Sequence, residues 1–236
     1  MPYTYKYPHP AVTVDIIIFA LHEDDLKVLL IQRKAEPFRE CWAIPGGFVE
    51  IDEDLETAAR RELWEETGVK DVFLEQLYTF GTPHRDPRER VISVAYYSLV
   101  RLSQHTIRAA SDALNACWYP IHHLPTLAFD HQKIMDMAIT RLQGKVLYVP
   151  IIFELLPTQF RLDQLQKVFE IILERPFDSR SFNKKILATE ILTQVDGPVG
   201  DNGKPSQRLF KFDEAKYQRM QEEGFQFEIK PGSPKK

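Results

Sequence analysis

The segment 47–69 constrains this chain most, because it carries acidic residues where a helix normally buries apolar ones. An apolar stripe begins at Leu55, Ala58 and Ala59. At about 100° per residue, three glutamates continue that stripe: Glu62, Glu65 and Glu66. Carboxylates one helical turn apart repel, and burying each of them is unfavourable unless positive charge compensates. The pattern therefore predicts a bound divalent cation.

The chemistry of the donors indicates which cation this is. Clustered carboxylate oxygens without nearby Cys or His favour Mg²⁺ or Mn²⁺ over zinc. The two cysteines, Cys41 and Cys117, have no metal-binding spacing, so we expect reduced structural thiols. Just upstream, Gly46 and Gly47 allow the backbone to approach a ligand closely. An anionic, phosphate-bearing ligand fits this combination.

The spacing of these residues resembles the Nudix box at every defined position. The matching residues, in order, are Gly47, Glu53, Arg61, Glu62, Leu63, Glu65, Glu66, Gly68 and Val69. The resemblance implies a Nudix fold, an α/β/α sandwich that hydrolyses a nucleoside diphosphate linked to another group. It also implies metal ligation by Glu62, Glu65, Glu66 and the Gly46 carbonyl. Glu53 and Arg61 would hold these ligands in position, and a box glutamate or an acid from a later loop would be the base.

Two other interpretations of the box stay open. The helix could be a solvated surface element stabilised by charge pairs, although its acids lie on the apolar stripe. Alternatively, the domain could keep the box and have lost its activity.

Size and composition bound the remaining possibilities. A chain of 236 residues suits two domains, and its 44% apolar and 27% charged residues are ordinary for a globular protein. The longest apolar run, 14–21, contains Asp15 and is too short to cross a bilayer, and the first ten residues lack a signal-like apolar region. We expect a cytoplasmic protein without a membrane partner.

The first domain is predicted to span residues 10–146. Its strands are expected at 12–20, 27–33, 72–80, 91–101 and 115–120. The box helix should begin near Asp52 or Asp54 and end at Gly68, and a further helix should cover 130–143.

Arginines next to the box point to phosphate recognition. The loop 81–90 contains Arg85 and Arg88 ahead of an Ile-Ser-Val-Ala-Tyr strand, and it resembles the corresponding loop of ADP-ribose pyrophosphatase-like Nudix enzymes. Substrate contact is expected from four residues: Arg33, Gly47, Arg85 and Arg88. The alternative is a solvated loop in which neighbouring acids neutralise the arginines. The seven histidines are expected to be solvated.

A second domain is predicted at 156–217, with 218–236 as a flexible tail. Helical spacing covers 160–175 and 178–187, and the strands 191–195 and 207–212 flank a polar loop at 197–206. This is the winged-helix order. DNA contacts are predicted for seven residues: Arg180, Ser181, Asn183, Lys184, Lys185, Lys204 and Arg208. A cap that dimerises or covers the first domain is the alternative.

The whole chain resembles the Nudix-related transcriptional regulators, in which an ADP-ribose-type ligand controls a DNA-binding domain. The box is often degraded in that family, whereas here it is intact. The sequence therefore favours Mg²⁺- or Mn²⁺-dependent hydrolysis of ADP-ribose or a related nucleoside diphosphate derivative. The alternative is a regulator that binds double-stranded DNA and senses that ligand. A homodimer would suit either function.

Overall fold

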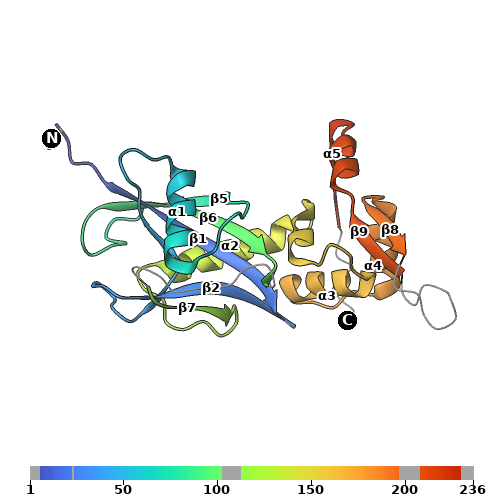
Figure 1. Ribbon diagram of the computed structural model, residues 1–236, viewed down its shortest axis with the longest axis horizontal. Helices are drawn as coiled ribbons and strands as arrows, with labels where there is room; N and C mark the ends of the chain where they lie inside the picture. The colour runs from blue at the N-terminus through green and yellow to red at the C-terminus, as the bar shows by residue number, and fades with distance from the viewer. Residues whose placement is uncertain (1–5, 23, 103–112, 197–207, 230–236) are drawn as a thin grey trace. The chain divides into compact units, whose positions relative to one another are not determined.

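The chain forms two compact units, Met1–Thr140 and Arg141–Lys236. The computed structural model describes residues 6–22, 24–102, 113–196 and 208–229 (Figure 1). No helix within these ranges combines the length and apolar content that crossing a membrane requires.

The first unit is built on a seven-stranded sheet in the order β3-β2-β1-β6-β5, with β4 paired to β1 and β7 paired to β2. The strands are β1 (Ala11–His22), β2 (Asp25–Arg33), β3 (Trp42–Ala43), β4 (Gly46–Phe48), β5 (Glu75–Phe80), β6 (Val91–Val100) and β7 (Ala113–Pro120). β1 and β6 run parallel, whereas the other paired strands are antiparallel. The central position of β1 explains its nearly continuous apolar sequence.

The helix α1 (Leu55–Thr67) covers one face of this sheet. The Asp54 carboxylate caps it by accepting from the Thr57 amide, and Gly68 ends it in the left-handed conformation. Ala58 and Ala59 pack with alternate β1 residues such as Val14. The expected helix is therefore confirmed, with Asp54 rather than Asp52 as the cap.

The helix α2 (His131–Lys145) starts on the opposite face. Successive side chains of a strand point to opposite faces, so Asp15 points away from α1. His131, the first residue of α2, lies 3.5 Å from the Asp15 carboxylate. The sheet thus lies between helices, as expected for an α/β/α sandwich.

The second unit has the winged-helix order. Its elements are a 3₁₀ helix (Pro150–Leu155), α3 (Leu162–Leu173), α4 (Ser179–Ala188), β8 (Leu192–Asp196), β9 (Arg208–Phe212) and α5 (Glu214–Glu222). The predicted apolar face of α3 is confirmed, because Leu165, Val168, Phe169 and Ile172 are all buried. Phe160 extends the two-stranded sheet through a pair of backbone hydrogen bonds with Phe210.

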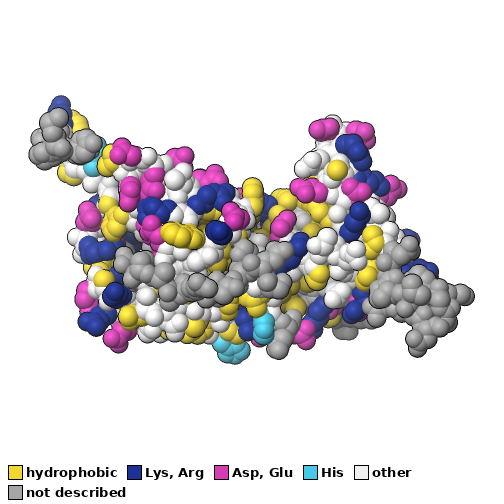
Figure 2. Space-filling view, in the orientation of Figure 1, with side chains coloured by type: hydrophobic (Ala, Val, Ile, Leu, Met, Phe, Trp, Pro, Cys, Tyr) yellow, Lys and Arg dark blue, Asp and Glu magenta, His cyan; other side chains and the backbone are white. Residues whose placement is uncertain are grey.

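The expectation of a flexible tail at 218–236 is wrong for residues 218–229. α5 continues to Glu222, and side chains of both charge signs cover its surface (Figure 2). Beyond it, Phe227 and Ile229 are buried, and the Ile229 amide donates to the Leu147 carbonyl at 2.8 Å. The segment packs against the start of its own unit because two apolar side chains require cover.

Candidate functional site

Arg61 forms hydrogen bonds with several residues of the box. Its guanidinium donates to both Glu53 oxygens, at 3.0 and 2.5 Å, and to Glu62 Oε1 at 2.8 Å. It also donates to the Phe48 carbonyl at 3.1 Å, which ties the helix to the end of β4. The hydrogen bond with Glu53 is the largest cause that raises the pKa of Arg61 above its ordinary value. Arg61 therefore stays charged and fixes the side chains around it.

The two glycines before the box allow the glutamates of α1 to approach the backbone. The Gly46 amide donates to Glu66 Oε2 at 2.8 Å. A Cβ on Gly47 would lie 2.3 Å from Glu62 Oε1, and a Cβ on Gly46 would lie 2.1 Å from the Val14 carbonyl oxygen. Only glycine fits at either position without displacing a neighbour.

The three glutamates of the predicted metal cluster are not equivalent. Glu66 is 7% exposed and the Glu62 side chain is 14% exposed, whereas the Glu65 side chain is 39% exposed. Consecutive helical residues point about 100° apart, so Glu65 falls at the edge of the stripe that Glu66 occupies. Glu65 lies 3.3 Å from Arg61, which also binds Glu62 at 2.8 Å, so exposure and not this contact distinguishes Glu65. The prediction of three inward-facing carboxylates is therefore wrong for Glu65.

The donor set suits a hard divalent ion that also uses substrate oxygens. Within the described ranges, no three His, Cys, Asp or Glu side chains are grouped closely enough to hold a metal ion by themselves. Magnesium commonly binds through one or two carboxylates, with water and phosphate oxygens completing its shell. Burial raises the pKa of Glu62 even though Arg61 donates to it, so this carboxylate is short of compensating positive charge. Glu62, Glu66 and the Gly46 backbone fit a divalent ion on these grounds.

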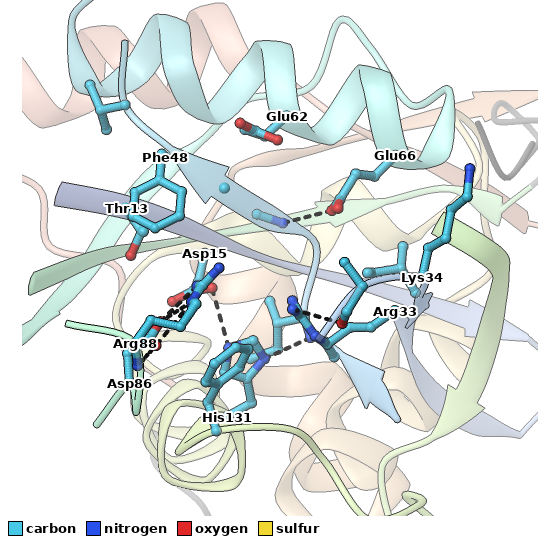
Figure 3. Close-up of a pocket in the computed structure, with 18 of the residues that line it drawn as sticks. Thr13, Asp15, Arg33, Lys34, Phe48, Glu62, Glu66, Asp86, Arg88 and His131 are labelled. Atoms are coloured by element: carbon cyan, nitrogen blue, oxygen red, sulfur yellow. Dashed lines mark hydrogen bonds and ion pairs between the residues drawn. The ribbon is translucent and has the colours of Figure 1, made fainter. Parts of the chain in front are cut away.

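A pocket of about 620 Å³ opens beside these residues. Figure 3 shows Glu62 and Glu66 on one side of β4, and Arg88, Asp86 and His131 on the other. Its lining thus combines the acidic box residues with a second, mixed region. That region contains Thr13, Asp15, Arg33, Lys34, Arg85, Asp86, Arg88, Phe129 and His131.

Arg33 and Arg88 are two of the four cationic residues of this second region. Their guanidinium carbons lie 4.7 and 5.6 Å from the centre of the Phe129 ring. Burial lowers the pKa of Arg33, and the nearby Arg88 lowers it further. Two guanidinium groups that repel each other in a pocket favour an anion between them, and a phosphate meets this requirement.

Arg88 and Arg85 occupy different environments, although both were expected to contact phosphate. Arg88 is held by Asp86 at 2.7 Å with its side chain 38% exposed. Asp86 thus neutralises Arg88, as the alternative of a solvated, self-neutralised loop requires, but Arg88 still lines the pocket. The Arg85 side chain is only 5% exposed and forms two hydrogen bonds with Asp130, at 2.7 and 3.2 Å. Arg85 is thus a buried partner of Asp130 that also lines the pocket, and its phosphate contact stays a prediction.

Asp15 and His131 belong to the pocket floor and did not emerge from the sequence. Asp15 accepts from the Ser93 hydroxyl and lies 3.6 Å from Arg85. The Ile44 amide donates to His131 Nδ1 at 2.9 Å, so the ring proton is on Nε2, toward Asp15. Burial lowers the pKa of His131. The expectation that the histidines are solvated is wrong for His131, because this side chain is buried. The one signal in the sequence for a polar pocket floor was Asp15, which lies within an apolar run.

In the second unit, α4 presents most of the predicted DNA-contacting side chains. Arg180, Ser181, Lys184 and Lys185 are exposed on it, and the Asp178 carboxylate caps its start. Asn183 is half-buried, so its side chain is less available than predicted. Arg208 is exposed at the beginning of β9, while Lys204 lies outside the described residues.

These features define a Nudix-type domain with a pocket lined by carboxylates and arginines, joined to a winged-helix domain. Family models agree with both assignments: residues 9–138 match the NUDIX domain, and residues 152–212 match the NrtR DNA-binding winged helix domain. The chain belongs to the Nudix family and to its subgroup that carries the NrtR-type winged helix.

Individual relatives resemble either the whole chain or its first unit. The ADPR responsive transcriptional repressor NtrR of Acinetobacter baylyi is 32% identical over 210 residues, which is 87% of this chain and 83% of that protein. The ADP-ribose pyrophosphatase of Methanocaldococcus jannaschii is 45% identical over 129 residues, which is 55% of this chain and 73% of that protein.

A solved structure resembles both units together. Shewanella oneidensis NrtR in complex with a 27mer DNA has a TM-score of 0.72 at 35% identity, covering 85% of this chain and 93% of that chain. The NUDIX domain of the same Shewanella protein, solved with ADP ribose, has a TM-score of 0.54 at 35% identity and covers 59% of this chain and 94% of that chain. Nudix hydrolases as a family use divalent metal ions, and the carboxylates described above suit one.

Proposed function

We propose that this protein is a DNA-binding transcriptional regulator whose Nudix domain senses ADP-ribose or a closely related nucleoside diphosphate derivative. One observation carries the proposal: a phosphate-suited pocket and a winged helix with an exposed basic α4 occur together in one chain. Similarity to the Acinetobacter repressor over 87% of the chain supports this combination.

The test is a gel-shift titration of the full chain on duplex DNA from upstream of its own coding sequence. Wild-type protein should bind this duplex in a salt-dependent manner. ADP-ribose should change the fraction bound at concentrations where AMP does not. Absence of DNA binding even at low salt would reject the proposed regulatory function. DNA binding that does not change with ADP-ribose would reject only the proposed sensing.

A second candidate function, hydrolysis, is favoured by the arrangement of the box. Arg61 holds Glu53 and Glu62, and Glu66 accepts from the Gly46 amide, which supports a catalytic role for these box residues. We propose that Glu62, Glu66 and the Gly46 carbonyl would hold Mg²⁺ or Mn²⁺, which when bound would supply polarisation of the pyrophosphate and activation of water. Arg33 and Arg88 would hold the phosphates, and Glu65 would contribute at the edge of the site.

Hydrolysis is tested by incubating the protein with ADP-ribose and either ion, and following AMP and ribose 5-phosphate. Glu66→Gln should reduce turnover by orders of magnitude, because an amide is a poor ligand for a hard cation. Glu56→Gln is the matched control, since Glu56 lies exposed on the same helix and pairs with Arg60. Undiminished turnover in Glu66→Gln would reject the assignment of Glu66 as a metal ligand.

The same variant separates the two functions. If Glu66→Gln stops hydrolysis and ADP-ribose still changes the fraction of DNA bound, ligand binding alone is the signal. If both are lost, the metal is required for sensing.

We further propose a twofold dimer, because winged-helix proteins commonly read two half-sites. Sedimentation of the free protein tests the dimer.

A further inference from the structure

Thr13 is a buried polar residue in the pocket floor that the proposed chemistry does not use. It is 8% exposed, lies in β1, and lines the pocket together with Asp15 two residues later. Among the described residues, its Oγ1 has no hydrogen-bond partner. A hydroxyl both donates and accepts, and leaving it buried and unpaired is unfavourable. Such a group is retained at low cost if a partner from outside the protein, an ordered water or a ligand group, satisfies it.

The surroundings of Thr13 indicate the chemistry of that ligand group. In the sheet, Thr13 lies opposite Phe48 of β4 and Ser93 of β6. Ser93 already donates its hydroxyl to Asp15, so it does not serve Thr13. Figure 3 shows Thr13 beside the Phe48 ring, with Asp15 further into the floor.

The charges nearby argue against a phosphate at this position. The Asp15 carboxylate on the same strand face repels an anion, and Arg85 beside it is already bound to Asp130. A further cation nearby is Arg88, whose guanidinium carbon lies 5.1 Å from the centre of the Phe48 ring, and Asp86 pairs with it at 2.7 Å. A neutral group that donates a hydrogen bond suits both the Thr13 oxygen and the negative floor. In a nucleoside diphosphate sugar, the neutral donors are the ribose hydroxyls and the amino group of the base.

We propose that Thr13 is a specificity-determining residue whose hydroxyl binds a neutral hydrogen-bond donor of the ligand, outside the metal and phosphate positions. This inference rests on the proposed function, because it concerns the same pocket. It extends that function by assigning recognition of the uncharged part of the ligand to the floor of the sheet.

The test is the isosteric variant Thr13→Val, with Thr13→Ser as its matched control. Calorimetric titration with ADP-ribose should show affinity about 5- to 100-fold weaker for Thr13→Val, and within about threefold of wild type for Thr13→Ser. Thermal stability without ligand should not fall in Thr13→Val, because the hydroxyl has no protein partner to lose.

Titration with ADP in parallel identifies the donor. Weakening confined to ADP-ribose assigns the hydroxyls of the terminal ribose, and equal weakening with ADP assigns the adenosine half. Equal affinity of wild type and Thr13→Val for both ligands would overturn the inference. Wild-type protein that binds neither ligand would instead reject the proposed sensing function, so the two failures are distinguishable.

Discussion

The Arg85 guanidinium meets the Asp130 carboxylate at two points, with Nη2–Oδ1 2.7 Å and Nε–Oδ2 3.2 Å. The pair joins the loop after β5 to the residue just before α2, and the Arg85 side chain is 5% exposed. Both segments line the pocket, so this buried pair sets its shape.

Asp130→Asn should destabilise the first unit. The substitution removes the acid that binds the buried Arg85 most closely and leaves Asp15, at 3.6 Å, as the nearest carboxylate among the described residues. We expect the free energy of unfolding to fall by about 3 kcal/mol, as is usual when one member of a buried pair is removed. Urea denaturation measures this change. Arg39→Ala, which removes the exposed pair with Glu40, is the control and should have no measurable effect.

The buried His131 should make the stability depend on pH. Its folded-state pKa is depressed, chiefly by burial, and Asp15, Asp130, Arg85 and Arg33 are the charged groups that face it. As pH falls below the ordinary value of 6.5, the unfolded chain takes up a proton that the folded protein resists. Stability should therefore be full above that pH and decline below it.

His131→Gln removes this titration and leaves an acceptor for the Ile44 amide. Unfolding free energies measured from about pH 8 to pH 5 should decline less steeply for this variant than for wild type. Parallel curves for the two proteins would show that His131 is not buried in its neutral form.

Gly47→Ala should damage the metal site without unfolding the domain. The new methyl group would overlap Glu62 Oε1, whose flexible side chain swings aside. We expect metal uptake, measured by calorimetry with Mn²⁺ and ADP-ribose, to weaken at least about 10-fold. Gly144→Ala on α2 is the matched control, since its methyl group meets no atom within 4 Å. Unchanged uptake in Gly47→Ala would place the metal away from Glu62.

Phe227→Ala should destabilise the winged-helix unit. Phe227 is 2% exposed, and truncating a buried phenylalanine costs about 3 to 5 kcal/mol. Thermal unfolding of the full chain measures the loss. The neighbouring Gln226→Ala is the control, because Gln226 is exposed. A tail without fixed contacts, as the sequence suggested, would make both variants behave like wild type.

The double variant Arg180→Ala with Lys184→Ala should weaken DNA binding on every sequence. Both side chains are exposed on α4, where they can reach phosphates. The slope of log affinity against log salt should decrease by about one for each phosphate that the variant no longer neutralises. Arg39→Ala with Lys70→Ala, two exposed residues of the first unit, controls for the loss of two positive charges. An unaltered salt slope would indicate that α4 does not contact the DNA backbone.

Local spacing within the sequence determined the box, its helix and the winged-helix order. Asp54 and Gly68 fix the ends of α1 through contacts within a few residues, and the apolar period of α3 defines its buried face. The helical period predicted that Glu65 faces inward together with Glu66, although the Glu65 side chain is 39% exposed and lies at the edge of the site. These properties are readable because they depend on near neighbours along the chain.

The pocket floor, by contrast, was decided by tertiary structure. Ser93 and Asp15 are 78 residues apart, and Ile44 and His131 are 87 apart, yet each pair is hydrogen-bonded. The sequence predicted Arg85 as a phosphate ligand, whereas in the folded protein it is hydrogen-bonded to Asp130. It also predicted Phe227 as part of a flexible tail, whereas the phenyl ring is buried. A side chain's charge partners and cover come from distant segments, and these are set only when the whole unit packs together.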